Sequence, residues 1–125
     1  MKKILISDRS RMFYSLIERW AHEEYPDLEV SFASDGFDTL LRCTHTPPDL
    51  LFVDISIDQL SGMQVLRTLK EQRNGLENVP VVIITDNPNR FDREYVLMCG
   101  GADYLAKTGK IDDIKRVIET YLFDE

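Results

Sequence analysis

The sequence lacks the features that would mark a membrane, disulfide-rich or nucleic-acid-binding protein. No apolar run approaches the ~20 residues that a membrane span needs, and the apolar start at 4–6 turns polar too early for a signal peptide. A cytoplasmic protein with no membrane partner is therefore expected. Two cysteines, Cys43 and Cys99, are too few and too far apart for a metal site or a disulfide framework, so reduced thiols are expected. The net charge of −7 argues against nucleic-acid binding by this domain, but an acidic pocket would favour a metal cation.

The composition is that of an ordinary globular protein. The 125 residues are 43% hydrophobic and 30% charged, which is enough for one domain with a proper core. No linker, internal repeat or composition shift divides the chain. Residues 1–125 are therefore expected to form a single domain.

Strand-like and helix-like segments alternate five times. Short apolar or β-branched runs predict strands at 3–7, 28–33, 49–54, 79–85 and 103–106, with the second at a sheet edge. Each strand is followed by an amphipathic helix. The expected inward positions are Phe13, Leu16, Ile17 and Trp20 in the first helix, Val65, Leu66 and Leu69 in the third, and Ile111, Ile114, Val117, Ile118, Tyr121 and Leu122 in the last.

Smaller signals mark the limits of the helices. Ser10 is a plausible N-cap for the first helix, Phe37, Leu40 and Leu41 mark the second, and Lys70 is expected to point outward from the third. The fourth helix is expected at 90–99. Strands alternating with helices imply parallel pairing, right-handed crossovers and helices on both faces, so the fold class is α/β with a doubly wound sheet.

Polar residues stand at the carboxyl ends of four predicted strands. They are Asp8, Asp54, Thr85 and Lys107. In a doubly wound sheet these ends share one edge, where ligands bind. Two carboxylates with a lysine and a hydroxyl suit Mg²⁺ and a phosphoryl group, with one carboxylate as its acceptor. Each residue alone could equally be a helix cap, a turn residue or a solvated charge, so the prediction depends on all four together.

At these residues the chain resembles the CheY-like receiver (REC) domain of two-component response regulators. The resemblance covers essentially the whole chain and is carried by 4–8, by 48–54 with Gly62 eight residues on, by 82–85 and by 101–107. It implies the flavodoxin-like (βα)5 fold with a five-stranded parallel sheet in the order 2-1-3-4-5.

The resemblance also implies roles for the site residues. Asp54 would be the phosphoacceptor, and Lys107 would pair with the phosphoryl group. Mg²⁺ would be held by Asp8, Asp54 and the backbone carbonyl of Ser56. A phospho-aspartate switch of this kind is an enzyme only in catalysing its own phosphorylation and dephosphorylation.

Thr85 and Tyr104 would form the switch pair that carries the signal. The hydroxyl would move toward the phosphoryl group while the aromatic ring turns inward. A histidine kinase or histidine phosphotransfer protein would supply the phosphoryl group. A downstream effector would bind the face made by helix 4, strand 5 and helix 5, and homodimerisation on phosphorylation is a habit of the family.

The chain departs from the family's pattern at several positions. Ser7 replaces one of two consecutive acids, which predicts weaker Mg²⁺ binding. Asp86 stands where a small residue is usual and is expected to restore part of that charge, or else to hinder access and repel a phosphoryl group. Asp58 replaces a proline, which predicts a less rigid loop. Thr108 replaces the proline after Lys107, and a trans bond is expected because a cis bond before a non-proline residue costs ~2.5–4 kcal/mol.

Two alternative functions remain beside the switch. Ser7, Asp86 and Thr108 would suit a pseudo-receiver that binds a protein without phosphorylation, although the retained strand-end residues count against it. Ser56 and Asn87 occupy positions that tune dephosphorylation in the family. An enzyme on a similar sheet is disfavoured, because a haloacid-dehalogenase-like phosphatase needs an acid at position 56, and a flavodoxin needs a phosphate loop after the first strand.

Overall fold

The computed structural model describes residues 1–57, 59–108 and 111–123. Asp58, where a less rigid loop is expected, lies outside these residues. The strands are β1 (Lys3–Ser7), β2 (Glu29–Ala33), β3 (Leu50–Asp54), β4 (Val81–Thr85) and β5 (Asp103–Ala106). The helices are α1 (Met12–Glu24), α2 (Gly36–His45), α3 (Gly62–Lys70), α4 (Arg90–Met98) and α5 (Ile111–Leu122), with a 3₁₀ turn at Leu76–Asn78.

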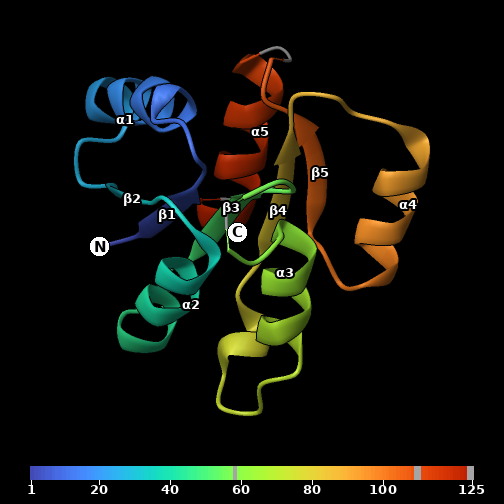
Figure 1. The fold of residues 1–125 in the computed structure, drawn as a ribbon. Coiled ribbons are helices and arrows are strands. Elements are labelled where there is room, and N and C mark those ends of the chain that lie inside the picture. The colour runs from blue at the N-terminus through green and yellow to red at the C-terminus, as the bar shows by residue number, and fades with distance from the viewer. Residues whose placement is uncertain (58, 109–110, 124–125) are drawn as a thin grey trace.

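The strands form one parallel sheet in the order β2-β1-β3-β4-β5 (Figure 1). The α/β flavodoxin-like prediction and the expected strand order are therefore confirmed, as is the edge position of β2. Strands β1 and β3 are neighbours in the sheet but are not consecutive in the chain, so the direction in which successive strands are added reverses between them. Open sheets of this kind bind ligands at that point, beyond the carboxyl ends of the strands.

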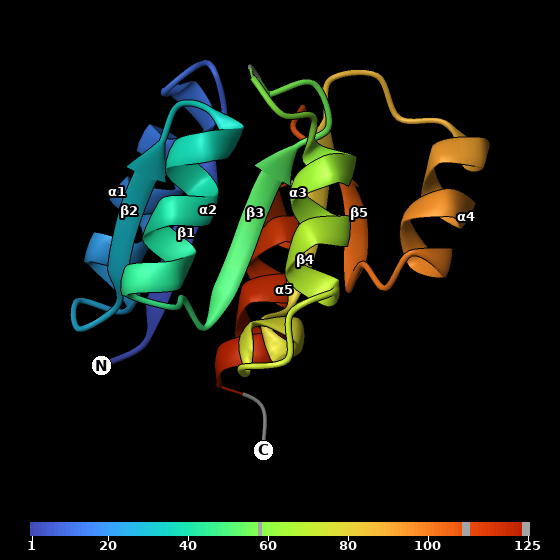
Figure 2. The same cartoon turned by 60° about the horizontal axis from the view of Figure 1, so that its bottom comes forward.

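Helices cover both faces of the sheet. Seen from below, α2 and α3 lie in front of it, α1 and α5 lie behind it, and α4 lies beyond β5 (Figure 2). Side chains alternate along each strand: Val53 joins the core under α2, α3 and α4, while Phe52 joins the core under α1 and α5. All five residues of β3 are buried, which explains why its sequence is a continuous apolar run.

Some side chains lie differently from their expected positions. Leu16 is 43% exposed and Tyr121 is 40% exposed, so both were wrongly expected in the core. The buried stripe of α1 runs through Phe13, Ile17, Trp20 and Ala21, and Leu16 lies on its flank. Tyr121 instead donates its hydroxyl to the Ala102 carbonyl at 3.1 Å.

Lys70 was wrongly expected to point into solvent. Its stem is half-buried, and its Nζ donates to the carbonyls of Glu77 at 2.8 Å and Val79 at 3.2 Å. The 3₁₀ turn that supplies these carbonyls was not expected, and it makes β4 begin at Val81 rather than Val79. Burying an ammonium requires such partners, and Lys70 therefore ties the end of α3 to the start of β4.

Two other local predictions are settled by the structure. The N-cap of α1 is Arg11 rather than Ser10, although the Ser10 hydroxyl accepts a hydrogen bond from the Met12 amide at 3.2 Å. Cys43 and Cys99 are both free, as expected. Burial raises the pKa of the Cys43 thiol to about 12, so this thiol stays protonated and unreactive.

Candidate functional site

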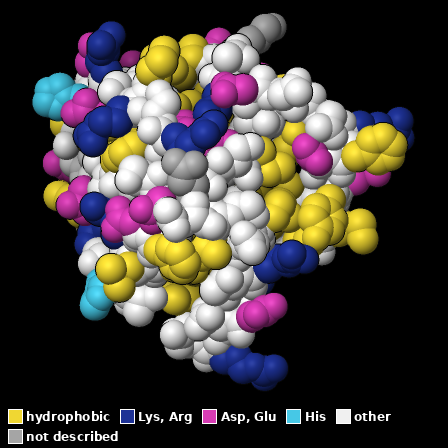
Figure 3. Space-filling view, viewed as in Figure 1, with side chains coloured by type: hydrophobic (Ala, Val, Ile, Leu, Met, Phe, Trp, Pro, Cys, Tyr) yellow, Lys and Arg dark blue, Asp and Glu magenta, His cyan; other side chains and the backbone are white. Residues whose placement is uncertain are grey.

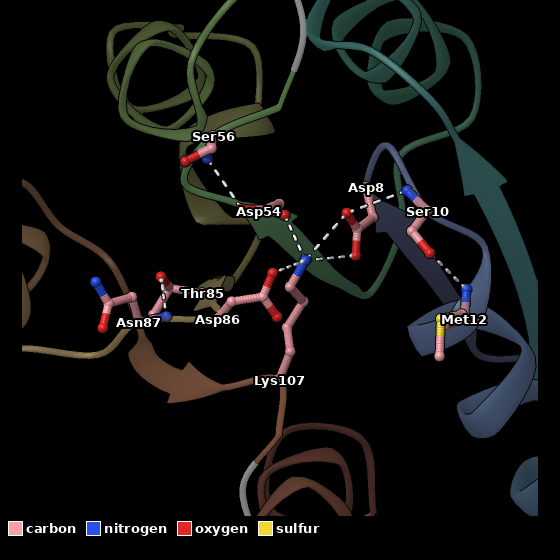
Figure 4. Close-up of polar contacts among 9 residues, drawn as sticks. All are labelled: Asp8, Ser10, Met12, Asp54, Ser56, Thr85, Asp86, Asn87 and Lys107. Carbon is pink, nitrogen blue, oxygen red and sulfur yellow. Dashed lines mark hydrogen bonds and ion pairs between the residues drawn. The ribbon is translucent and has the colours of Figure 1, made fainter.

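The sheet brings three of the four strand-end residues into contact. Asp8, Asp54 and Lys107 follow or end β1, β3 and β5, and their side chains converge at the carboxyl edge (Figure 4). Lys107 Nζ lies 2.6 Å from Asp54 Oδ2 and 3.1 Å from Asp8 Oδ2. It also lies 3.5 Å from Asp86 Oδ2. Three of the four predicted residues therefore lie together, and a third carboxylate, that of Asp86, joins them.

The three carboxylates differ in how far they are exposed to solvent. The side chains of Asp8 and Asp54 are 2% and 7% exposed, and Lys107 is 11% exposed, whereas Asp86 is 73% exposed. Two carboxylates thus sit below the surface with the ammonium between them. Asp86 approaches the same ammonium from the outside.

The backbone around Asp54 is fixed by close packing. Asp54 Oδ1 accepts a hydrogen bond from the Ser56 amide at 2.9 Å, and the Gly62 amide donates to the Ile55 carbonyl at 3.1 Å. A Cβ on Gly62 would lie 2.5 Å from the Asp54 carbonyl oxygen, so the β3–α3 loop closes tightly only with glycine there. Ser61 and Gln64 then form a capping box that starts α3.

The pKa values of the two buried carboxyls are shifted in opposite directions. Burial raises the pKa of Asp54, but hydrogen bonds from Lys107 and the Ser56 amide outweigh it and hold that pKa below its ordinary value. Burial, together with the neighbouring Asp54, raises the pKa of Asp8 against the opposing effect of Lys107. Burial lowers the pKa of Lys107, but its bonds to both carboxylates outweigh this and raise it. Asp54 is therefore an ionised carboxylate beside a protonated lysine.

Thr85 and Tyr104 lie on neighbouring strands and contact the segment that leads into α4. The buried Thr85 hydroxyl accepts a hydrogen bond from the Asn87 amide at 3.1 Å, and Figure 4 shows it turned away from Lys107. The buried Tyr104 ring points inward, and its hydroxyl accepts a hydrogen bond from the Asn89 amide at 3.1 Å. Because Asn89 is the N-cap of α4, both side chains hold the entrance to that helix.

Ser7 does not face the cluster. It is fully buried, and its hydroxyl accepts a hydrogen bond from Thr39 Oγ1 of α2 at 2.8 Å. The single proton of the Thr39 hydroxyl can instead be donated to the Asp35 carbonyl, which lies 2.7 Å away. Sequence reasoning missed Thr39, and a threonine among the apolar positions of α2 was the available signal. The position that would carry a second acid is therefore a neutral hydroxyl turned toward α2.

The donor set fits Mg²⁺. This ion is bound through one or two carboxylates and keeps several waters, and Asp8 and Asp54 supply two carboxylates. The described residues contain no group of three or more His, Cys, Asp or Glu side chains suited to a metal, so the remaining ligands would be backbone oxygens, water or a phosphoryl group. Ser56, whose carbonyl is the expected third protein ligand, lies in the turn after β3.

A cleft of about 390 Å³ opens beside the cluster. It reaches Asp8 and Lys107 and is bordered by Asp86 and by the α1 side chains Met12 and Leu16. No peptide bond is cis in the parts of the chain that the structure describes, so the expected trans bond between Lys107 and Thr108 is confirmed. None of the described helices is long and apolar enough to cross a membrane.

The family model for the response regulator receiver domain matches residues 4–119. The chain belongs to this family. Among curated relatives, Response regulator PleD of Caulobacter vibrioides is 34% identical over 112 residues, covering 90% of this chain and 24% of PleD. Regulator of RpoS of Escherichia coli K12 is 31% identical over 120 residues, covering 94% of this chain and 33% of that protein. The chain spans between 24% and 42% of the length of PleD, of Regulator of RpoS and of the phosphatase-synthesis regulator PhoP of Bacillus subtilis, and 69% of Protein PilG of Pseudomonas aeruginosa.

Solved receiver domains have the same fold. The receiver domain of the sensor histidine kinase PA1611 from Pseudomonas aeruginosa PAO1 is 26% identical, with a TM-score of 0.80 and 96% of each chain covered, and it has a magnesium ion coordinated in its active-site cleft. The receiver domain of the Francisella response regulator 1452 is 25% identical, with a TM-score of 0.83 and 97% of each chain covered. The protein is therefore a receiver domain of two-component signalling, as the resemblance implied.

Proposed function

We propose that this receiver domain is a Mg²⁺-dependent switch in which Asp54 accepts a phosphoryl group from a histidine kinase or a histidine phosphotransfer protein. The observation that carries the proposal is the position of Asp54. Its buried carboxylate lies 2.6 Å from the Lys107 ammonium, which also contacts Asp8 at 3.1 Å, at the carboxyl edge of the sheet. Its pKa is held below the ordinary value, so the carboxylate is ionised and can act as a nucleophile toward phosphorus.

The chemistry is an in-line transfer. An oxygen of Asp54 forms a bond to phosphorus while the phosphorus–nitrogen bond of a phosphohistidine breaks, and the departing imidazole takes the electron pair and a proton. Bound Mg²⁺, held by Asp8, Asp54 and the Ser56 carbonyl, would supply positive charge for the phosphoryl oxygens. The Lys107 ammonium contacts both carboxylates, so it would lie close to the transferred group and would neutralise a further phosphoryl oxygen.

The cleft suggests where a phosphodonor protein makes contact. Met12 is 82% exposed and stands with Leu16 on α1, beside the opening that leads to Asp8 and Lys107. Exposed apolar side chains next to a reactive site are typical of a protein-binding surface. A donor that packs on α1 would bring its phosphohistidine to the cleft.

Transmission to an effector would proceed through Thr85 and Tyr104. If the Thr85 hydroxyl turns to a phosphoryl oxygen, it releases the Asn87 amide, and the segment before α4 loses one of its anchors. Hydrophobic side chains gather on the α4 side of the molecule (Figure 3). The exposed large apolar residues of α4 are Phe91, Tyr95, Leu97 and Met98. A downstream effector, or a second copy after phosphorylation, would bind at the α4–β5–α5 face.

The alternative is a pseudo-receiver that binds its partner without phosphate. Ser7, Asp86 and Thr108 motivate it, but the ionised Asp54 and the intact contact with Lys107 favour the switch. The test is incubation with acetyl phosphate with and without Mg²⁺, followed by prompt intact-mass measurement, with Asp54→Asn as control. A single Mg²⁺-dependent phosphoryl adduct that is absent from the control supports the switch. No adduct, together with no response to beryllofluoride, would support the pseudo-receiver.

A further inference from the structure

Asp86 is the member of the cluster that the proposed transfer does not use. Asp54 is the acceptor and Asp8 a metal ligand, and both are buried. The Asp86 carboxylate is exposed, lies 3.5 Å from Lys107 Nζ, and borders the cleft that reaches Lys107 (Figure 4). A group that arrives through this cleft passes a fixed negative charge before it meets the ammonium.

The fold gives no competing reason for this carboxylate. Asn89, not Asp86, caps α4, and Asp92 is the acidic residue in its first turn. Asp86 is not buried, so no packing depends on it. The contact that it makes is with Lys107, the same ammonium that a phosphoryl group would have to engage.

We propose that Asp86 selects phosphodonors by charge, disfavouring small dianionic acyl phosphates and favouring donors in which phosphorus is bonded to nitrogen. This inference rests on the proposed transfer to Asp54. With acetyl phosphate, the Asp54–phosphorus bond forms as the phosphorus–oxygen bond breaks, and acetate leaves as an anion with the electron pair. Asp86 repels both the incoming dianion and the departing anion.

With a nitrogen donor the charges differ. The donor nitrogen carries a proton and a positive charge before transfer, and the electron pair of the breaking phosphorus–nitrogen bond returns to it, so a neutral amine or imidazole leaves. A carboxylate at the mouth of the cleft attracts the positive charge of the arriving donor and does not repel the neutral leaving group. Asp86 would therefore keep the domain insensitive to metabolic acyl phosphates while leaving the response to phosphohistidine intact.

The test compares two small donors, acetyl phosphate and phosphoramidate, which carries one negative charge fewer at neutral pH. Rate constants for Asp54 phosphorylation are measured by intact mass for the natural chain and for Asp86→Asn, at Mg²⁺ concentrations that saturate each. Asp27→Asn, an exposed aspartate at the opposite end of the sheet, is the matched control because it makes the same change in net charge. Asparagine keeps the size of aspartate, so access to the cleft is unchanged.

In Asp86→Asn, the rate constant for Asp54 phosphorylation should rise about three- to tenfold with acetyl phosphate and by less than about twofold with phosphoramidate. This size is expected because one charge acts on a dianion through water. The difference should shrink as salt is added, because an exposed charge is screened. Asp27→Asn should leave both rates unchanged.

Other outcomes would overturn the inference. Equal changes with both donors would mean that Asp86 acts by positioning Lys107, and no change would mean that it has no role in access. An equal effect of Asp27→Asn would assign the result to the net charge of the domain. If neither donor gives an Asp54-dependent adduct in any variant, the proposed function itself fails, which is a different and recognisable result.

Discussion

Replacing Lys107 by methionine removes the positive charge from the centre of the cluster while keeping a side chain of similar length. In the natural chain the ammonium contacts Asp54 at 2.6 Å and Asp8 at 3.1 Å, and both carboxylates are nearly fully buried. The variant leaves two buried carboxylates beside one another with no cation from this position. Removing one partner of a fully buried ion pair costs about 3–5 kcal/mol. Because the cleft admits water here, we expect a loss of about 2–3 kcal/mol in the free energy of unfolding at neutral pH.

The loss should depend on pH in a defined direction. The pKa of Asp54 is held below its ordinary value, so its stabilising contribution is present above the unfolded pKa of ~3.9 and is lost as pH falls through the folded pKa. The pKa of Lys107 is raised, so its contribution is present below ~10.4 and is lost as pH rises through the folded pKa. Without the ammonium, burial and mutual repulsion are expected to raise the pKa of both carboxyls in the variant, so they would destabilise the folded state only where they are ionised. The difference between the two chains is therefore greatest from ~5 to ~10 and shrinks toward pH ~4.

Urea unfolding at neutral and acid pH measures this difference directly. Lys2→Met is the control, since Lys2 is exposed and its loss makes the same change in net charge. Added Mg²⁺ should restore more stability to Lys107→Met than to the natural chain, because it replaces the missing charge. A loss that is equal at both pH values, or no larger than that of Lys2→Met, would refute the electrostatic account of the cluster.

Three further substitutions test how the site is held. Gly62→Ala places a Cβ 2.5 Å from a backbone oxygen and should cost about 1–3 kcal/mol in urea unfolding and slow phosphorylation. Gly75→Ala has a φ of +103° and nothing within 4 Å of the added atom, so it should cost about 1–2 kcal/mol of stability and leave phosphorylation unchanged. Equal phosphorylation rates in Gly62→Ala and Gly75→Ala would contradict the role of Gly62 at the site. Tyr104→Phe removes the acceptor of the Asn89 amide and should speed hydrogen exchange at that amide, with a loss of about 1 kcal/mol; unchanged exchange would mean that the hydroxyl does not hold α4. Ser61→Ala removes the capping box of α3 and should lower stability by about 1 kcal/mol in thermal unfolding, and an unchanged melting temperature would argue against the cap.

The strands and their alternation with helices could be predicted because a strand that is buried on both faces of the sheet is a continuous apolar run in the sequence. The five residues of β3 are all buried, and five consecutive apolar or strand-ending residues in the sequence indicate it without any long-range information. The strand order leaves no such trace. It depends on which strands pair across the sheet, and it was available only through the resemblance to receiver domains.

Errors in the helices came from treating the apolar stripe as wider than the buried arc. Leu16 and Tyr121 follow the 3/4 spacing, yet both lie at the edge of the covered surface. The prediction that Lys70 points into solvent was wrong for the opposite reason. A long charged side chain can bury its stem when carbonyls are in reach, and those carbonyls belong to a 3₁₀ turn that the sequence pattern did not indicate.

Convergence of Asp8, Asp54 and Lys107 was predictable because strand ends share an edge in any doubly wound sheet. The partner of Ser7 was not, since it depends on how α2 is rotated about its axis. The contact of Asp86 with Lys107 likewise depends on the path of the loop after β4. Rotation and loop path are set by packing of the whole domain, which no local pattern specifies.

The two charge changes in this domain are best understood together. Ser7 removes a carboxylate from a fully buried position and turns a neutral hydroxyl toward Thr39, so one desolvated charge is absent from the folded state. Asp86 adds a carboxylate at an exposed position, where its desolvation costs little. The third carboxylate near Lys107 therefore stands at the entrance of the cleft rather than below the surface. Because Asp86 is exposed and no packing depends on it, its replacement should be visible in donor preference rather than in stability, if the proposed charge selection is right.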